Sequence, residues 1–304
     1  MRKGWMHTDN GAGQEKFAPK TLAEAVYLDE GEQKNAGQLL GQLTGQNLLD
    51  NAYFPTAINQ RGLTQYPSAT WLYTIDRWRI HGAGYVEVTS AGIVLHRTGD
   101  WCLFVQFLEL PKSLRIGQTY TFTAVIDGEY ITATGTVDAN QYTKVTYFSN
   151  DGGYIDIVQE GVYLTVQIVL STLSAVTITR AKLEKGSIST LAQDPIPASM
   201  GPTLAACQRY YIAFSAWQHA TFLYGWGGLL AYIPTPVTMR GPSPVYTGEP
   251  LSVFDTDGAW HNVTYNGVTV EPGCLRVSLT GYTPINNNSD LILRGLGGFD
   301  GDLR

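Results

Sequence analysis

The sequence predicts a mainly β protein, with two jelly-roll-like β-sandwich domains that follow a short helical N-terminal segment. Several segments in the middle of the chain alternate apolar residues with Thr or Gln, which is the pattern of strands with one solvated face. The chain also contains 33 Gly, 18 Tyr and 7 Trp, a composition that suits strands joined by tight turns. Its length of 304 residues fits two domains.

Residues 1–46 are polar and have no strand-like alternation, so we expect short helices there. Thr21–Glu24 has the sequence of a capping box. A second stretch places four apolar residues on one helix face: Ala36, Leu39, Leu40 and Leu43. Both pieces are shorter than the roughly 12–15 residues that give a lone helix marginal stability. They would need the same segment of other copies or a docking site on another protein; otherwise the segment is an unstructured tail.

Residues 47–193 are predicted to form the first sandwich, because the alternating pattern is strongest there. The clearest expected strands are Tyr120–Ile126, Tyr130–Thr136, Tyr163–Leu170 and Val176–Leu183. Turn sequences separate them, at Asp127–Gly128, Asn150–Gly153 and Glu160–Gly161. Many short strands with no helix between them are typical of a jelly roll.

Residues 194–203 are predicted to be a stiff linker, because their prolines interrupt both helix and strand. The second sandwich would span residues 204–304. Its expected strands begin in Leu204–Tyr211 and continue as Trp260–Tyr265, Cys274–Leu279 and Asp290–Arg294. Three segments are expected at sheet edges, in irregular structure or as an exposed tail: Ile233–Pro236, Gly241–Pro244 and Gly295–Arg304.

Phe222–Leu230 is the most apolar stretch of the second expected domain. On the surface of a monomer such a stretch would be an aggregation liability. A buried strand or an interface between subunits therefore explains it best.

The composition argues against several classes of partner. A net charge of −6 and the lack of any basic run disfavour nucleic acid, whose binding depends on clustered Lys and Arg. Cys102, Cys207 and Cys274 are widely spaced, which fits buried free thiols made in a reducing cytoplasm rather than disulfides or a zinc site. No apolar run approaches the roughly 20 residues that span a bilayer, so we expect no membrane insertion.

Three groups of motifs resemble tail-fibre or receptor-binding proteins of phages and prophages of Gram-positive hosts. Phe17–Leu22 looks like a connector into a fibre. Asn47–Asn51, Ile58–Gly62 and Asp76–Trp78, with Ala181–Gly186 at the close, look like a carbohydrate-binding-module-like sandwich of such proteins. Cys207–Tyr211 and Pro236–Arg240 resemble the C-terminal domain that follows it. The resemblance implies a homotrimer in the virion tail, assembled in the host cytoplasm, that binds other tail or baseplate proteins and a host cell-wall or capsular glycan.

Aromatic residues in turn-rich stretches are the best ligand-binding candidates, because a rigid ring beside an amide or carboxylate complements a sugar. In the middle domain they are Trp71, Tyr73 and Tyr154. In the last domain they are Trp217, Trp226 and Trp260, with Asp255, Asp257 and Asn262 nearby. For any single Trp, a position in the core or at a subunit interface is more common than a ligand contact, and the sequence does not choose among them.

Asp76–Trp78 allows two interpretations. In the functional one, Arg77 and Trp78 line a sugar site. In the structural one, Arg77 pairs with Asp50 or Asp76 and Trp78 is buried against the opposite sheet. We favour the structural interpretation, because the planar guanidinium is suited to holding loops together through bidentate contacts.

The sequence gives no sign of catalysis. None of the common catalytic motifs occurs, the histidines lack ligand spacing, and Asp255 with Asp257 reads as a turn rather than an acid–base pair. We therefore expect a binding protein without a cofactor. Structural calcium remains an option at Asn150–Asp151 and at Asp255–Asp257. The alternatives are a purely structural baseplate or fibre-shaft protein and a glycan depolymerase.

Overall fold

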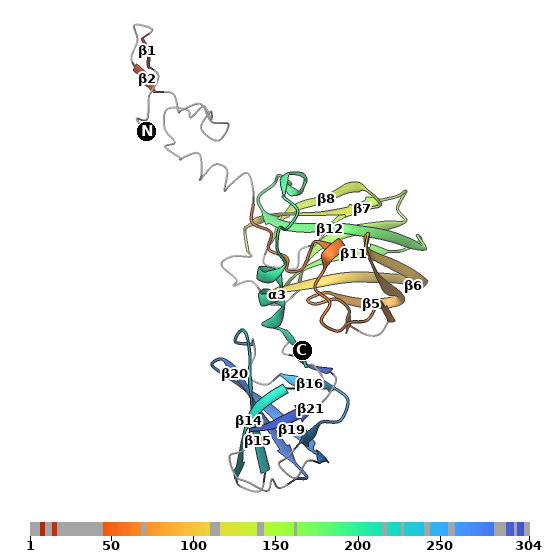
Figure 1. Ribbon diagram of the computed structural model, residues 1–304. Coiled ribbons are helices and arrows are strands. Elements are labelled where there is room, and N and C mark those ends of the chain that lie inside the picture. Colours follow the sequence, from red (N-terminus) through yellow and green to blue (C-terminus); the bar gives the residue numbers. More distant parts are fainter. Residues whose placement is uncertain are drawn as a thin grey trace.

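The structure is a computed structural model. It describes residues 7–9, 14–16, 45–67, 71–109, 116–138, 143–160, 163–214, 218–225, 228–239, 244–254, 259–282, 290–294 and 297–300. The protein is mainly β, as predicted (Figure 1). Within these ranges there is one α-helix, α3 (Gly201–Gln208), with two short 3-10 turns, η1 (Phe54–Thr56) and η2 (Leu191–Gln193). No helix in the described part of the chain is long and apolar enough to cross a membrane.

The largest sheet is antiparallel and curls until it is nearly closed (Figure 1). Its ten strands are β3 (Gln65–Pro67), β4 (Leu72–Tyr73), β5 (Arg79–Thr89), β6 (Gly92–Glu109), β7 (Thr119–Ile126), β8 (Glu129–Thr136), β9 (Thr143–Phe148), β10 (Gly153–Glu160), β11 (Tyr163–Leu170) and β12 (Ala175–Lys185). The order is β8-β7-β12-β6-β11-β10-β9, with β5 beside β6 and both β3 and β4 beside β5. The end strands β8 and β9 lie in contact. The strands expected near residues 120, 130, 163 and 176 are all present.

The sheet bends where β6 changes partner. Its first part pairs with β12 and its last part with β11, while β5 follows it on the other edge. A bulge between Gly82 and Gly84 lets β5 follow the bend. Gly82 has φ 92°, and a Cβ on Gly84 would lie 2.1 Å from the main-chain oxygen of His96. Both positions therefore require glycine.

The interior of the curled sheet is an aromatic and aliphatic core. Trp78 is fully buried and stacks on Phe104 with ring centroids 4.6 Å apart, while Phe54 meets Trp78 edge-on at 5.2 Å. The indole Nε1 donates to the main-chain oxygens of Asp50 and Asn51, both at 3.2 Å. The core thus also holds the segment that leads into the sheet.

The last third of the chain forms two smaller sheets. A three-stranded sheet has the order β13 (Tyr211–Phe214), β22 (Gly297–Asp300), β16 (Val245–Gly248). A seven-stranded sheet has the order β18 (Trp260–Asn262), β17 (Ser252–Phe254), β21 (Asp290–Arg294), β14 (Gln218–Gly225), β15 (Gly228–Pro234), β20 (Cys274–Thr280), β19 (Thr264–Glu271). These strands share a second hydrophobic cluster, which includes Phe222 and Leu229. The apolar stretch that contains both residues belongs to the paired strands β14 and β15 rather than to one strand, and both side chains are buried.

Three sequence predictions about elements are wrong. The expected strand in Leu204–Tyr211 is mostly the helix α3, and this helix begins inside the expected linker. Pro202 causes no break, because proline is tolerated in the first helical turn, where no intrahelical donor is lost. Segment Trp260–Tyr265 is divided between β18 and β19. The expected C-terminal tail contains β22, which pairs on both edges and buries Phe299.

The N-terminal segment also differs from expectation. It contains two short paired strands, β1 (His7–Asp9) and β2 (Gln14–Lys16), where no strand was predicted. The expected helical pieces at Thr21–Glu24 and 36–43 lie outside the described residues.

We expect Gly84→Ala to destabilise the protein by about 1–3 kcal/mol, because the added methyl group must displace the backbone of β6. Thermal unfolding of parent and variant measures this. Gly267→Ala is the matched control, since a Cβ there meets nothing within 4 Å. Equal unfolding midpoints for the two variants would contradict the packing described for the bulge.

Candidate functional site

One outer face of the ten-stranded sheet carries a band of aromatic and polar side chains. It runs across β4, β5, β6, β11, β10 and β9, on the side opposite the core. We call it the aromatic face. Its rings are Trp71, Tyr73, Trp101, Phe107, Tyr163, Tyr154 and Tyr147, and its polar members include Arg79, His81, Asp156, Thr165 and Gln167.

Two tryptophans flank a histidine at one end of the aromatic face. Trp71 stacks on His81 with ring centroids 4.4 Å apart and planes inclined by 8°. Trp101 meets His81 in an edge-type contact, with ring centroids 5.2 Å apart. The two indoles remain 38% and 41% exposed, respectively. Trp71 also has a positive φ of 58°, an uncommon conformation for a bulky residue and one that is often found at functional sites.

Tyr73 lies next to this group and is held by arginines. The Arg79 guanidinium lies 3.9 Å from the centre of its ring and donates a hydrogen bond to its hydroxyl. Arg61 approaches the same ring at 5.0 Å. These contacts fix the Tyr73 ring, and a fixed ring loses little entropy when a ligand stacks on it.

Two tyrosines form the other end of the face. Tyr147 and Tyr154 lie 5.5 Å apart, and Tyr147 is 58% exposed. Burial raises the pKa of the Tyr154 hydroxyl, and Asp156 and Tyr147 add to this shift. Four strand spacings separate Tyr154 from Trp71, which corresponds to about 19 Å.

The floor between the two ends is apolar but contains unsatisfied polar atoms. Leu103, Val105 and Val169 form a small buried cluster against which Phe107 and Tyr154 pack. In the described part of the chain, the side-chain atoms of this face that are buried without a hydrogen-bond partner include His81 Nδ1, Asp156 Oδ1 and Thr165 Oγ1. Such atoms cost stability, because nothing replaces their lost hydration. They suggest a ligand with its own donors and acceptors.

The structure brings together three of the predicted site residues. Trp71, Tyr73 and Tyr154 share the aromatic face, and none of them is a core residue. Trp260 and Asn262 lie elsewhere, on the edge strand β18, where Trp260 packs on Phe254 at 5.2 Å. The other candidates lie outside the described residues: Trp217, Trp226, Asp255 and Asp257.

Sequence reasoning missed most of the face, including Arg79, His81, Trp101, Phe107 and Asp156. The stretch from Trp101 to Phe107 is apolar at nearly every position, because β6 is buried on both sides. Alternation therefore could not separate its two faces. The exposed Trp101 directly after Asp100 was the one available signal.

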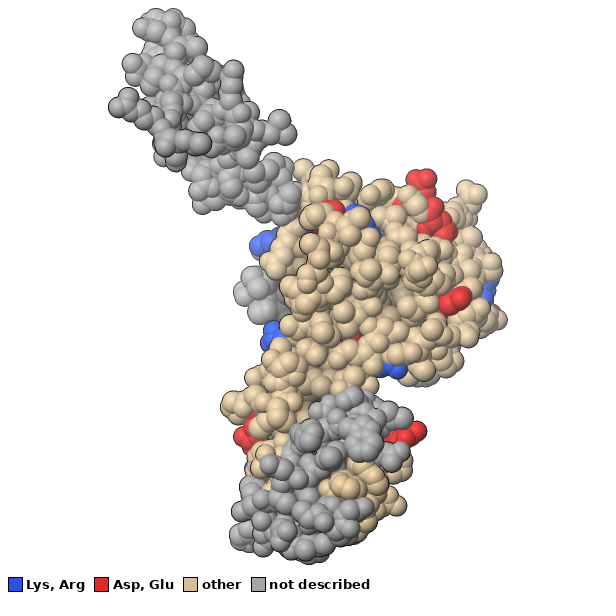
Figure 2. All heavy atoms as spheres, in the orientation of Figure 1, with Lys and Arg blue, Asp and Glu red and all other residues tan. Residues whose placement is uncertain are grey.

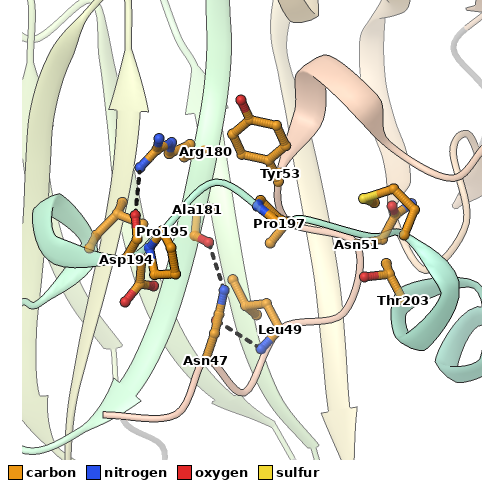
Figure 3. Close-up of a pocket in the computed structure, with 13 residues that line it drawn as sticks. Asn47, Leu49, Asn51, Tyr53, Arg180, Ala181, Asp194, Pro195, Pro197 and Thr203 are labelled. Atoms are coloured by element: carbon orange, nitrogen blue, oxygen red, sulfur yellow. Dashed lines mark hydrogen bonds between the residues drawn. The ribbon is translucent and has the colours of Figure 1, made fainter. Parts of the chain in front are cut away.

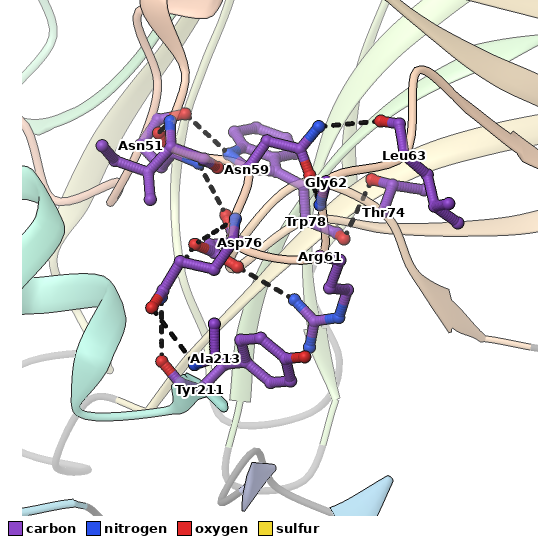
Figure 4. A network of polar contacts seen from close by, with 12 residues as sticks. Asn51, Asn59, Arg61, Gly62, Leu63, Thr74, Asp76, Trp78, Tyr211 and Ala213 are labelled. Carbon is purple, nitrogen blue, oxygen red and sulfur yellow. Dashed lines mark hydrogen bonds and ion pairs between the residues drawn. The ribbon is translucent and has the colours of Figure 1, made fainter. Parts of the chain in front are cut away.

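Asp76 lies at the centre of a polar network below the aromatic face (Figure 4). Its carboxylate accepts hydrogen bonds from Arg61 Nη1 at 3.0 Å and from the Gln60 side-chain amide at 3.0 Å. Arg77 pairs with Asp50 at 3.1 Å and donates to the main-chain oxygen of Phe107 at 3.2 Å. With Trp78 in the core, these contacts agree with the structural interpretation of Asp76–Trp78.

The same network holds the chain after α3. Gln60 donates to the main-chain oxygen of Tyr211 at 2.9 Å and accepts from the amide of Ala213 at 3.4 Å (Figure 4). The Arg61 guanidinium lies 3.9 Å from the Tyr211 ring centre, and that of Arg77 lies 3.4 Å from the Tyr210 ring centre. Two consecutive tyrosines are thus clamped by two arginines.

A pocket of about 270 Å³ lies between the leading segment 47–53, β12 and the chain that leaves the sheet (Figure 3). Its polar groups serve mainly to join these segments. Asn47 donates to the main-chain oxygen of Ala181, and Arg180 donates to that of Asp194. Lys182, buried beside it, contacts the Asp194 carboxylate at 2.6 Å. The polar groups of this pocket are thus used to join segments of the fold. The aromatic face, in contrast, has buried polar atoms without a hydrogen-bond partner.

The described part of the chain contains no group of three or more His, Cys, Asp or Glu side chains that could hold a metal ion. Asn150 and Asp151 occupy a turn with positive φ angles of 52° and 64° before β10. On the side of the molecule in Figure 2, acidic and basic residues are scattered among neutral ones.

No family model, curated protein or solved structure matches this sequence. The function proposed for the chain therefore depends on the chemistry of its own residues. Of the two places considered, the aromatic face has the composition of a ligand-binding surface.

We expect Asp76→Asn to destabilise the protein by about 3–5 kcal/mol, because the change breaks a buried ion pair with Arg61. It also places the NH2 group of the new side chain against neighbouring hydrogen-bond donors. Thermal unfolding measures the loss. Glu271→Gln is the control, since its partner Arg276 is exposed and such pairs contribute about 0–1 kcal/mol. An Asp76→Asn protein as stable as the control would refute the central role of this network.

Proposed function

We propose that the protein is a tail-fibre or receptor-binding component of a phage-type particle, and that its aromatic face binds a host cell-surface glycan without transforming it. The observation that carries the proposal is the combination on one sheet face of exposed rings with buried polar atoms that lack partners. The motifs quoted above add the phage context.

The chemistry of this face suits a sugar chain. Pyranose rings present apolar C–H faces, which stack on Trp and Tyr, and hydroxyls, which both donate and accept hydrogen bonds. Trp71 and Trp101 at one end and Tyr147 and Tyr154 at the other offer stacking surfaces. Strand β4, next to Trp71, lies four strand spacings from β10, about 19 Å, and β6, which carries Trp101, lies two spacings from it. An extended oligosaccharide can contact both ends and place its hydroxyls over the floor.

The proposal includes two β-sandwich domains, residues 47–193 and 204–304, in a homotrimer. Two hydrophobic clusters that share no residue support two units, and the opposed layers of the curled sheet support a sandwich. Residues 1–46 would attach to other tail or baseplate proteins. Three weak sites on one rigid particle raise avidity through effective concentration, so no single site needs to be tight.

A glycan depolymerase is the second candidate, and Asp156 favours it. Burial raises the pKa of this carboxyl to about 7, as in general acids of glycosidases. New reducing ends released from host polysaccharide, and lost in Asp156→Asn, would establish catalysis. Without them at high protein concentration, the non-catalytic proposal stands.

We expect the full-length protein to have three times the mass of one chain in solution, measured by light scattering coupled to size exclusion. The expectation follows from the trimeric arrangement proposed for the particle. A monodisperse monomer at micromolar concentration would rule out the trimer while leaving the glycan site open.

We expect Trp71→Ala and Tyr154→Ala each to weaken binding to host cell-wall polysaccharide about tenfold or more, because each removes a stacking surface. The soluble parent should block adsorption of the phage, and both variants should block it less. Tyr130→Ala is the control, since Tyr130 is 51% exposed but lies on β8, outside the aromatic face. A parent protein that neither binds polysaccharide nor blocks adsorption would favour a purely structural fibre-shaft or baseplate role.

A further inference from the structure

Asp156 occupies the floor of the aromatic face. It lies on β10, opposite Gln167 of β11 on one side and Val145 of β9 on the other. Tyr154, two residues earlier on the same strand, lies on the same face. Two residues of an extended strand span about 7 Å, so a ligand that stacks on Tyr154 lies beside Asp156.

The Asp156 carboxyl is buried but not satisfied. The residue is only 5% exposed, and its Oδ1 has no hydrogen-bond partner among the described residues. A buried carboxyl that serves only the fold would be paired or hydrogen-bonded. Leaving an oxygen without a partner costs free energy, which is regained when a ligand supplies a donor.

The surroundings of Asp156 contain no adjacent cation among the described side chains. The titratable and cationic groups that the structure describes on this face are Tyr147 on β9, Tyr154 on β10, Tyr163 on β11, Arg79 and His81 on β5, and Tyr73 on β4. Arg79 is three strand spacings from Asp156, about 14 Å. Burial alone raises the Asp156 pKa to about 7, because desolvation disfavours the charged form.

We propose that Asp156 is a specificity residue of the aromatic face: in its ionised form it accepts a hydrogen bond from a hydroxyl of an uncharged sugar and disfavours anionic ligands. The inference rests on the proposed glycan-binding function and names the ligand class, a neutral polyhydroxylated chain. Phosphate-bearing or uronic-acid polymers would bring a second negative charge to a buried carboxylate and are disfavoured.

The sign of the resulting pH dependence follows from linkage. A donated hydrogen bond stabilises the carboxylate, so the Asp156 pKa is lower in the complex than the value of about 7 in the free protein. Affinity is then highest above pH 7 and falls as the pH drops below it. With a shift of at least two pH units, the dissociation constant rises about tenfold from pH 8 to pH 6.

The test is calorimetric titration of the full-length protein with defined probes at pH 6 and pH 8. The probes are neutral oligosaccharides of glucose, galactose and N-acetylglucosamine, and poly(glycerol phosphate) as the anionic polymer. We expect a neutral probe to bind about tenfold more tightly at pH 8. Asp156→Asn should lose this pH dependence and bind with the same affinity at both values, because it removes the titrating group. The exposed Asp100→Asn should keep the pH profile of the parent.

A second measurement needs no variant and covers a failure of Asp156→Asn to fold. Titration of the parent at pH 7 in two buffers of different ionisation enthalpy should show net proton release on binding. A neutral probe that binds without proton release or pH dependence would overturn this inference and leave the proposed function intact. The inference would also be overturned, with the proposed function intact, if the anionic polymer bound more tightly than the neutral probes and its affinity fell as the pH rose. If no probe binds at either pH, both are overturned.

Discussion

The structure depends on one turn, between β4 and β5, that sends three consecutive side chains in three directions. Trp78 enters the core, Asp76 gathers Gln60 and Arg61, and Arg77 reaches Asp50 and the main chain of β6. A positive φ of 75° at Arg77 makes this divergence possible. Because the three groups are almost entirely buried, the turn joins the core, the leading segment and the chain after α3 into one structure.

The aromatic face owes its character to a sheet layer that is buried on both sides. Phe104 and Ile168 face the core, while Leu103, Val105 and Val169 form an apolar floor on the other side. An outer face that met only water would carry polar side chains at these positions. An apolar floor with unsatisfied polar atoms and a rim of exposed rings is instead the composition of a surface that contacts another molecule.

The clamp between Arg61, Arg77 and the two tyrosines links the face to the rest of the chain. Arg61 contacts Tyr73 on the face as well as Tyr211 after α3, and Arg77 contacts both Tyr210 and the main chain at Phe107. Motifs more than 130 residues apart in the sequence thus meet in space. A binding face held in this way loses little conformational entropy on binding, which benefits a multivalent attachment protein whose single sites are weak.

The sequence by itself determined the fold class, four of the ten strands of the large sheet, and three aromatic residues of the candidate site. Period-two alternation and turn chemistry are local properties, so they can be read wherever one face of a strand is wet. The helix α3, the strand β22 and the hairpin β1–β2 were missed because their local signals are weak or conflicting, as in the Pro-led start of α3. Only the tertiary structure decided which strands are neighbours. It therefore decided that Trp71 and Tyr154, 83 positions apart, share a face with Asp156, since strand pairing depends on contacts that no local pattern encodes.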